Sequence, residues 1–318
     1  MHFDVFNGDA DGIIALVQLR LAEPKNTTLI TGVKRDIMLV EQVPVEQAKS
    51  VTILDISMEK NAPALKQLLD NDADIFYVDH HRSGEIPTSN KLTAIIDTDA
   101  NTCTSLLVNN HLNGQFAHWA IAAAYGDNML ASADTLAEQC GLSILEKSQL
   151  KALGIYINYN GYGRSIDDLH FSPEQLFKQL VKYDNPLMLI GEENSVYHQL
   201  ENAYNQDMDK ALSAKILFDS ESCKAVKLPD EAWARRVSGV FGNELANQSP
   251  DKAHIVFTIN TDDTYTVSLR APLNNKQGAG DICADFPTGG GRAAAAGVNK
   301  LPAEKVNAFI EAVAQYYA

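Results

Sequence analysis

The sequence predicts an α/β protein of two domains, the first built on a mostly parallel sheet and the second a smaller α/β domain. In the first half, short apolar runs of strand character alternate with segments of helical spacing, as in strands joined by crossover helices. From Ala214 onward, strand-like runs return beside further helical segments. A length of 318 residues accommodates about two domains of ordinary size.

The N-terminal half supplies the predicted parallel sheet. We expect strands over 2–6, 27–32, 51–54, 75–78 and 92–96, and helices over 12–21 and 62–71. From about residue 104 to 153 the spacing of apolar residues is helical, and this region includes an Ala-rich stretch at 118–125. Short buried strands that alternate with helices predict a sheet covered on both faces.

The chain changes character near Pro186. The polar segment 194–213 has the spacing of a connecting helix, and strand-like runs follow at 224–228, 253–260 and 264–270. Helical spacing around 232–245 and 303–316 completes the second domain. We therefore predict domains over residues 1–190 and 216–318, joined by a helical linker over 191–215.

The composition is that of a protein with apolar cores. An apolar share of 45%, a formal net charge of −15 and an isoelectric point near 4.9 argue against an extended surface for long nucleic acid. The four cysteines are widely separated and form no metal-binding pair, which is expected in a reducing compartment. No apolar run reaches the ~18 residues of a membrane span, and no signal peptide is recognisable. We expect a cytoplasmic protein.

Acids and histidines stand at the ends of the strand-like runs. They are Asp9, Asp11, Asp55, Asp79, His80 and His81, with Asp127 further along the chain. The strand ends of an open α/β sheet converge on a crevice, where such sheets bind ligands. Several carboxylates crowded there repel one another strongly unless cations neutralise them. The pattern therefore indicates a metal-dependent enzyme.

Each acid taken alone has a plain structural explanation. Asp9 and Asp55 can cap the helices that follow them, and Asp127 by itself is unremarkable. The adjacent histidines are more specific, because they point in different directions, so that one can bind metal while the other faces the substrate. Asp79 can orient a histidine through its second ring nitrogen.

Taken in order, the acid pair, the single acid, the Asp-His-His triplet and the last acid resemble the pattern of the DHH phosphoesterase superfamily. The resemblance implies two divalent ions that activate a water for attack on phosphorus. The ligands that it implies are Asp9 for one ion, Asp55 as a bridge, and Asp11, His80 and Asp127 for the other. It gives His81 a contact with the scissile phosphate or the leaving oxygen, and Asp79 a supporting catalytic role. Mn²⁺ is the expected metal, with Mg²⁺ and Co²⁺ as alternatives, because mixed carboxylate and imidazole ligands suit manganese.

One position departs from that pattern. Many members have a histidine four residues before the first acid of the pair, and this chain has Val5 there. Asn7 lies near enough in the sequence to supply an oxygen or to hold a water. The departure concerns the ion that Asp9 would hold.

The second domain carries a glycine-rich segment, Gly289-Gly290-Gly291-Arg292, after a strand that ends at Arg270. A glycine run alone is typical of a flexible loop, but this one resembles the signature of the DHHA1 domain. The resemblance implies that Arg270 contacts the substrate phosphate and that the glycine amides bind an anion, and we expect the segment that follows to be a helix. Most relatives have histidine after the glycines. Arg292 can still bind a phosphate or a guanine edge through two N–H groups.

Two other segments are candidates for substrate contacts. The run 158–163 is rich in aromatic, amide and glycine residues, so Tyr159 or Tyr162 can stack on a base, or both can pack in a helix-ending turn. Asn101 follows a predicted strand and can line the site. Cys103 has no activating base beside it, which favours a packing role over that of a nucleophile.

Together the two resemblances span nearly the whole chain, and they imply a cleft between a metal-bearing domain and a smaller substrate-binding one. Such a cleft favours short substrates. We expect a phosphodiesterase that hydrolyses short oligoribonucleotides, chiefly dinucleotides such as pGpG, to mononucleotides, as the bacterial nano-RNases of this superfamily do. Neither long nucleic acid nor a membrane is an expected partner, and the oligomeric state stays open, a homodimer included.

Three alternatives remain. A 3′-phosphoadenosine 5′-phosphate phosphatase would use the same metals, and so would a pyrophosphatase or polyphosphatase, although pyrophosphatases have the extra histidine and lack the glycine-rich arginine segment. A catalytically silent nucleotide-binding regulator is the third. Val5 and Arg292 favour it, whereas the otherwise complete ligand set argues against it.

Overall fold

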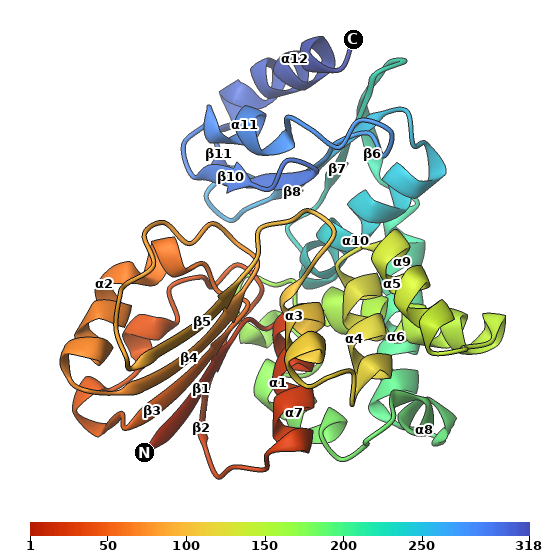
Figure 1. Ribbon diagram of the computed structural model, residues 1–318. Coiled ribbons are helices and arrows are strands. Elements are labelled where there is room, and N and C mark those ends of the chain that lie inside the picture. The colour runs from red at the N-terminus through yellow and green to blue at the C-terminus, as the bar shows by residue number, and fades with distance from the viewer. The chain divides into compact units, whose positions relative to one another are not determined.

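The computed structural model describes residues 1–318, which divide into two compact units, Met1–Asn202 and Ala203–Ala318. The division falls within helix α9 (Val196–Ala211), inside the segment for which the sequence predicts a connecting helix. Each unit has a β-sheet of its own (Figure 1). The predicted fold class, a mostly parallel α/β domain followed by a smaller α/β domain, is confirmed.

The first unit contains a five-stranded sheet in which every neighbouring pair is parallel, in the order β2-β1-β3-β4-β5. The strands are β1 (His2–Phe6), β2 (Thr28–Ile30), β3 (Ser50–Leu54), β4 (Asp74–Asp79) and β5 (Leu92–Ile96). The chain passes from β1 to β2 on one side and then returns to β3 on the other side of β1. The carboxyl ends of β1 and β3 therefore form a switch point, where open sheets of this kind leave a crevice.

Neighbouring side chains of the strands pack on opposite faces of this sheet, because the side-chain period of a strand is two. Phe6 and Val78 join a core with helix α1 (Ala10–Ala22), whereas Val5 and Ile53 join a second core with helix α2 (Met58–Asp70). All four of these side chains are fully buried. Burial of an apolar side chain of this size contributes roughly 1.5–3 kcal/mol to stability.

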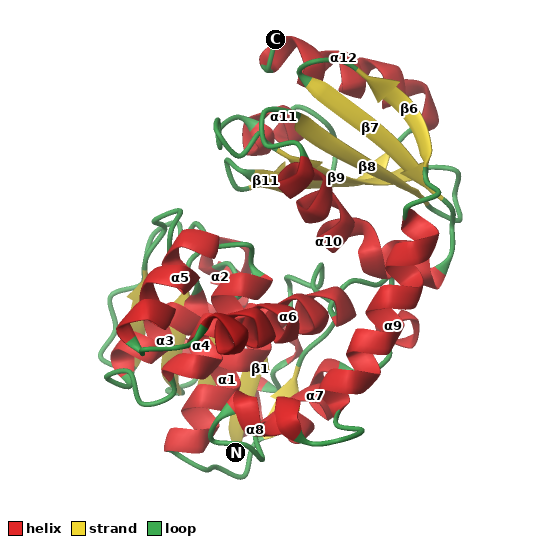
Figure 2. Cartoon of the chain, turned by 90° about the vertical axis from the view of Figure 1, so that its right-hand side faces the viewer, coloured by secondary structure: helices red, strands yellow, loops and turns green.

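The remaining helices of the first unit follow β5. They are α3 (Thr104–His111), α4 (Ala117–Gly126), α5 (Leu130–Gln139), α6 (Ile144–Asn160), α7 (Pro173–Leu180) and α8 (Pro186–Gly191). Three short 3₁₀ turns lie at Val40–Gln42, Val45–Gln47 and Ile166–Asp168. Helices α1, α3, α4 and α6 lie close together (Figure 2).

Helix α4 is held closely against α6 by small residues. A Cβ atom at Gly154 of α6 would lie 1.9 Å from the carbonyl oxygen of Ala122, so only glycine permits this approach. The five consecutive residues 120–124 of α4 are fully buried. Because α4 ends at Gly126, this packing fixes the position of Asp127 immediately after the helix.

The second unit contains a six-stranded sheet in the order β10-β11-β9-β8-β7-β6. Its strands are β6 (Lys215–Asp219), β7 (Cys223–Leu228), β8 (Ala253–Ile259), β9 (Tyr265–Arg270), β10 (Gly289–Gly291) and β11 (Ala295–Leu301). Only β7 and β8 pair in parallel, and the other neighbours are antiparallel.

Three helices belong with that sheet: α10 (Ala232–Gln248), α11 (Ala279–Ala284) and α12 (Val306–Tyr316), the last preceded by a 3₁₀ turn at Ala303–Lys305. The core of this unit contains Phe257 and Phe309, whose rings meet edge to face with centroids 6.0 Å apart. None of the helices in the structure combines the length and the apolar character that crossing a membrane requires.

Candidate metal centre

The first unit brings the acids and histidines of the sequence pattern together beyond the carboxyl ends of β1, β3 and β4. Two groups have ligand atoms that all lie within 4.8 Å of one another. One group is Asp11, His80 and Asp127, and the other is Asp55, His80 and His81. Because His80 belongs to both groups, they form one continuous cluster. Four segments that are distant in the sequence contribute to it.

His80 is oriented as a metal ligand. Its Nδ1 lies 3.0 Å from the backbone carbonyl oxygen of Thr102, which can only accept a hydrogen bond. The proton therefore sits on Nδ1, and the lone pair of Nε2 faces the acids. Nε2 lies 3.4 Å from an oxygen of Asp55 and 3.8 Å from one of Asp11.

Asp79 holds the second histidine of the triplet. Its Oδ1 accepts a hydrogen bond of 2.7 Å from Nδ1 of His81, and its side chain is fully buried. Burial by itself lowers the pKa of His81, but the hydrogen bond and the charge of Asp79 raise that pKa overall. The side chain of His81 remains 37% exposed, so its imidazole can reach a bound molecule.

Asp11 is fixed by the start of helix α3. Its two carboxylate oxygens accept hydrogen bonds from the backbone amides of Thr104, at 2.8 Å, and Ser105, at 2.7 Å. The positive end of the helix favours a carboxylate at this position. Burial nevertheless raises the pKa of Asp11, because its side chain is only 1% exposed and the charged form loses its hydration.

Asp55 adopts an uncommon backbone conformation. Its φ of 57° lies in the left-handed region, which costs a residue other than glycine about 1–3 kcal/mol and is often found at functional sites. The hydroxyl of Thr104 lies 3.3 Å from its Oδ1. Burial raises the pKa of Asp55 well above its usual range, and the charges of Asp9 and Asp11 raise it further.

The donor set of this cluster fits a divalent cation. Buried carboxylates with raised pKa values are acids without enough positive charge around them, and an imidazole nitrogen of the correct tautomer faces the same space. Carboxylate oxygens combined with imidazole suit Mn²⁺ and related ions.

Asp9 is arranged differently from the other acids. Its Oδ1 caps helix α1, accepting from the amides of Asp11 at 3.0 Å and Gly12 at 3.1 Å. Its Oδ2 forms an ion pair with the ammonium group of Lys34. Burial alone would raise the pKa of Asp9, but the charge of Lys34 lowers that pKa overall. Asp9 therefore belongs to neither ligand group.

Sequence reasoning did not find Lys34, which lies in the loop after β2 and belongs to no motif. The sequence feature that could have led to it is Val5, because an acid without its usual histidine neighbour needs another partner. Asn7, which the sequence offered as a source of an oxygen or as a holder of a water, has both of its side-chain groups engaged with the backbone. Its Oδ1 accepts from the amide of Asp9 and its Nδ2 donates to the carbonyl of Lys34, so Asn7 fastens two backbone segments together.

The tyrosines of the run 158–163 pack inside the first unit. Tyr159 is fully buried, and its hydroxyl bonds to Nε2 of His170 at 2.9 Å. Its ring has no free face for a base, so the stacking interpretation is wrong and the packing interpretation holds. Tyr162 is 7% exposed and lies beneath the Lys34 ammonium group, 5.4 Å from it. Cys103 is fully buried, and burial raises the pKa of its thiol, in agreement with a packing role.

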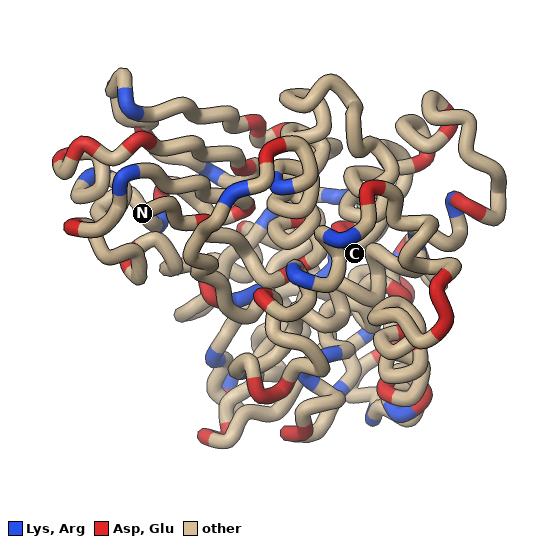
Figure 3. The backbone as a smooth tube through the Cα atoms, turned by 90° about the horizontal axis from the view of Figure 1, so that it is seen from below, with Lys and Arg blue, Asp and Glu red and all other residues tan.

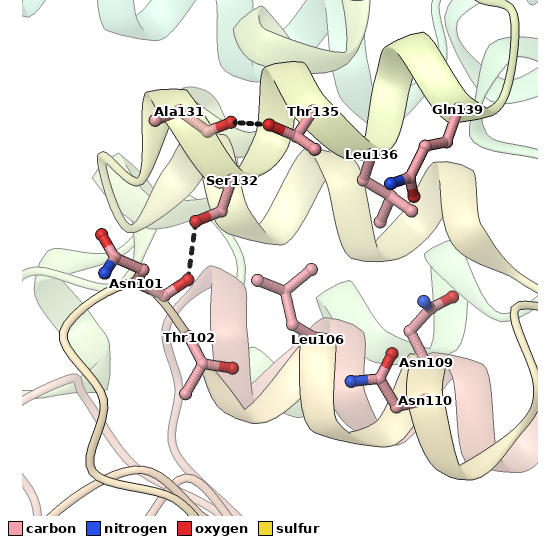
Figure 4. Close-up of a pocket in the computed structure, with 10 residues that line it drawn as sticks. All are labelled: Asn101, Thr102, Leu106, Asn109, Asn110, Ala131, Ser132, Thr135, Leu136 and Gln139. Carbon is pink, nitrogen blue, oxygen red and sulfur yellow. Dashed lines mark hydrogen bonds between the residues drawn. The ribbon is translucent and has the colours of Figure 1, made fainter.

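Asn101 lies beside a pocket of about 400 Å³ between α3 and α5 (Figure 4). Its backbone carbonyl accepts a hydrogen bond of 2.6 Å from Ser132 on α5. The amides of Asn109, Asn110 and Gln139 line the same pocket. Thr102 also lines this pocket, and its backbone carbonyl holds His80. Asn101 is therefore adjacent in sequence to a residue that orients a candidate metal ligand.

The glycine-rich segment of the second unit is part of the sheet. Gly289, Gly290 and Gly291 form β10, which pairs with β11, so the expectation that a helix follows the glycines is wrong. Arg292 lies in the hairpin turn between these strands. No helix forms after the glycines because the alanine-rich run after Arg292 also pairs with β9, and this pairing outweighs the helical preference of alanine.

Arg270 ends β9 and is held against helix α10. Its Nε donates to the side-chain oxygen of Asn243, and Nη2 donates to the carbonyl of Gly239 at 3.1 Å. A third bond runs from Nη1 to the carbonyl of Leu269 at 3.2 Å. A guanidinium has five N–H groups, so this fixed side chain retains donors for an anion.

Comparison with known proteins gives one domain match and several structural matches. Residues 220–318 match the family model of the DHHA1 domain. No curated protein sequence matches the chain. Among solved structures, exonuclease RecJ bound to manganese is similar, with 18% identity, a TM-score of 0.58, and coverage of 99% of this chain and 90% of RecJ.

Two further structures resemble the whole chain. The pGpG-specific phosphodiesterase PggH from Vibrio cholerae has 15% identity and a TM-score of 0.54, with coverage of 100% of this chain and 99% of PggH. An exopolyphosphatase-related protein from Bacteroides fragilis has 14% identity and a TM-score of 0.54, with coverage of 99% and 92%. At such identities the likeness is one of fold. The resemblance predicted from the sequence is thus confirmed: residues 220–318 are a DHHA1 domain, and the chain as a whole shares the fold of RecJ and PggH.

Proposed function

We propose that the protein is a divalent-metal-dependent phosphodiesterase that hydrolyses short oligoribonucleotides, chiefly dinucleotides such as pGpG, to mononucleotides. The observation that carries this proposal is the buried cluster around His80, in which carboxylates from three other segments face one imidazole nitrogen. The fold shared with a pGpG-specific phosphodiesterase and with an exonuclease supports the choice of a phosphodiester substrate.

A short substrate agrees with the charge of the chain. The formal net charge is −15, and basic positions are interspersed with acidic ones along the backbone (Figure 3). A protein that tracks along a nucleic acid neutralises many phosphates with Lys and Arg. A few local cations suffice for a dinucleotide, because it has only one bridging phosphate.

Asp11, His80 and Asp127 would hold the ion, with Asp55 beside them. A divalent ion bound there would lower the pKa of a bound water and neutralise charge on the phosphate. We propose Mn²⁺, with Mg²⁺ and Co²⁺ as alternatives, since the RecJ structure is described as bound to manganese. The superfamily resemblance implies a second ion on Asp9, but the Asp9 side does not fit it, because Lys34 already pairs with that carboxylate.

His81 is the residue that we propose to contact the scissile phosphate or the leaving oxygen. Asp79 fixes Nδ1 of this ring, which leaves Nε2 as the nitrogen that a substrate can reach. The raised pKa keeps the ring protonated to higher pH, and a protonated imidazole attracts phosphate oxygens. Asp79 acts through His81 and is a positioning residue.

The DHHA1 domain would bind the rest of the substrate. Arg270 retains N–H donors for a phosphate, and Arg292 stands in a hairpin turn next to the glycine strand. At Gly290 a Cβ atom would meet nothing within 4 Å, so the fold itself does not require glycine at this position. An anion that contacts the bare backbone there is a reason for its presence.

A substrate panel tests this proposal. The purified protein is assayed with pGpG, pApA, longer oligoribonucleotides, 3′-phosphoadenosine 5′-phosphate and pyrophosphate, with Mn²⁺ and then with a chelator. Conversion of the dinucleotides to two mononucleotides, lost with chelator, supports the proposal. Release of orthophosphate from bisphosphorylated adenosine or pyrophosphate would favour the phosphatase alternatives, and binding without turnover would favour a regulator.

A further inference from the structure

The ammonium group of Lys34 lies on the side of the acidic cluster where the superfamily resemblance places an ion. Its Nζ pairs with Oδ2 of Asp9, and it lies 3.1 Å from Oδ1 of Asn158 and 3.5 Å from Oδ1 of Asp127. An ammonium has three N–H donors, and three oxygens surround this one. The side chains of Lys34 and Asp9 are 23% and 5% exposed, so the pair is largely shielded from water.

The backbone of Lys34 is anchored at both of its polar groups. Its amide donates to the carbonyl of Gly161 at 2.8 Å, and its carbonyl accepts from Nδ2 of Asn7 at 3.1 Å. The loop also lies against the β1–α1 turn, because a Cβ atom at Gly8 would be 1.9 Å from the carbonyl oxygen of Gly32. The position of the ammonium group is therefore a property of the fold.

Little donor capacity remains at Asp9 for a metal ion. One of its oxygens caps helix α1 through two amides, and the other faces Lys34. Val5, at the position of the usual histidine, is fully buried in the apolar core with α2 and offers no donor. A divalent ion placed on the free side of Asp9 would also be repelled by the ammonium charge a few ångströms away.

We propose that Lys34 takes the place of one of the two divalent ions, so that the protein binds a single ion, on the side of Asp11, His80 and Asp127. The ammonium neutralises Asp9 and holds one oxygen of Asp127, whose Oδ2 lies 4.0 Å from Nε2 of His80. Lys34 is thus a positioning residue that keeps Asp127 turned toward the remaining ion. This inference rests on the proposed function, because it concerns the metal of that same centre.

Metal stoichiometry tests the inference without recourse to activity. Full-length protein is equilibrated with Mn²⁺ by dialysis, the bound metal is counted by elemental analysis, and the Mn²⁺ spectrum is recorded by electron paramagnetic resonance. We expect one equivalent per chain and the spectrum of an isolated ion. Two equivalents with a spin-coupled spectrum would overturn the inference and leave the proposed function standing. Binding of no ion would overturn both.

The variant Lys34→Ala tests the role of the ammonium group directly. Lys66→Ala is its matched control, since Lys66 forms an exposed ion pair with Asp70 on α2. Without the ammonium, Asp9 lacks a counter-charge. We expect Lys34→Ala to bind more than one equivalent of Mn²⁺ at high concentration and, at the concentration that saturates the wild-type site, to turn over pGpG about tenfold more slowly or worse. Occupancy and turnover equal to those of Lys66→Ala would refute the role of Lys34.

Discussion

Oδ1 of Asp79 accepts a 2.7 Å hydrogen bond from Nδ1 of His81, so the acid of the Asp-His-His triplet orients the second histidine of the triplet. The first histidine, His80, is held instead by the Thr102 carbonyl at 3.0 Å. Adjacent residues that leave a strand point to different sides, and each ring has its own support. We therefore predict separable roles for the two histidines, with His80 toward the metal and His81 toward the substrate.

The variant His80→Ala should lose metal. Removing the imidazole that belongs to both ligand groups takes one ligand from each of them, so we expect Mn²⁺ affinity to fall about 10–100-fold or more and turnover of pGpG to be abolished. Titration calorimetry with Mn²⁺ measures the affinity, and circular dichroism checks the fold. Wild-type affinity in a folded His80→Ala protein would contradict the ligand assignment.

The variant Asp79→Asn should keep its affinity for Mn²⁺ but lose activity. The amide keeps the shape of the side chain but removes the charge that holds His81, so we expect kcat to drop about 10²–10⁴-fold. Mn²⁺ affinity should stay near that of the wild type, since Asp79 is in neither ligand group. A parallel loss of metal and activity would show that Asp79 acts on the metal side.

Two neighbouring glycines of β10 give a matched test of the DHHA1 segment. At Gly289 a Cβ atom would lie 1.8 Å from the carbonyl oxygen of Cys283, whereas at Gly290 it would meet nothing within 4 Å. We expect Gly289→Ala to destabilise the second unit by about 1–3 kcal/mol or more.

Gly290→Ala should leave the melting temperature nearly unchanged but raise KM for pGpG severalfold, because the methyl group keeps an anion away from the backbone. Thermal unfolding and steady-state kinetics measure the two effects. An unchanged KM for Gly290→Ala would mean that substrate does not approach this strand.

Asp4 should stabilise the first unit in a pH-dependent way. Burial alone raises its pKa, but hydrogen bonds from Arg20 and His2 outweigh burial and lower the pKa from 3.8 to about 2. A lowered pKa means stability that is fully present above about pH 4 and is lost as the pH falls through about 2. The shift corresponds to about 2 kcal/mol.

Asp4→Asn should therefore be less stable than the wild type at neutral pH, with the difference shrinking below pH 4. Urea unfolding at a series of pH values measures it, and Asp70→Asn is the control, because the side chain of Asp70 is 64% exposed. A difference that stays constant from pH 7 to about 2 would count against the Asp4–Arg20 pair as its source.

Much of the fold was readable from the sequence because its signals are local. The short, mostly apolar segment 2–6 predicted a strand, and the structure gives His2–Phe6 as β1. The parallel arrangement followed from the alternation of strands and helices, since parallel neighbours need a crossover. The acids of the candidate site were visible because such sheets bind ligands at their strand ends, so a motif at each end was enough.

The conformation of the glycine-rich segment could not be predicted from local sequence preferences. Glycine and alanine have weak preferences for strands, and the run 289–301 reads as a loop followed by a helix. In the folded chain Gly289–Gly291 pairs with β11, and β11 pairs with β9, so the sheet determines the conformation. Tyr159 gives a second example, because an aromatic residue near a motif does not reveal whether its ring is buried.

The sequence by itself determined the fold class, the approximate positions of the strands of the parallel sheet and the set of acids and histidines that can meet. The tertiary structure decided which of them do so and what else joins them. Asp79 orients His81, Asn7 holds the backbone of Lys34, and Lys34 reaches Asp9 from the loop after β2. The physical reason is that parallel strands bring the loops after β1 and β2 to one edge of the sheet. Residues 25 positions apart in the chain thereby become ion-pair partners, and no local pattern records that contact.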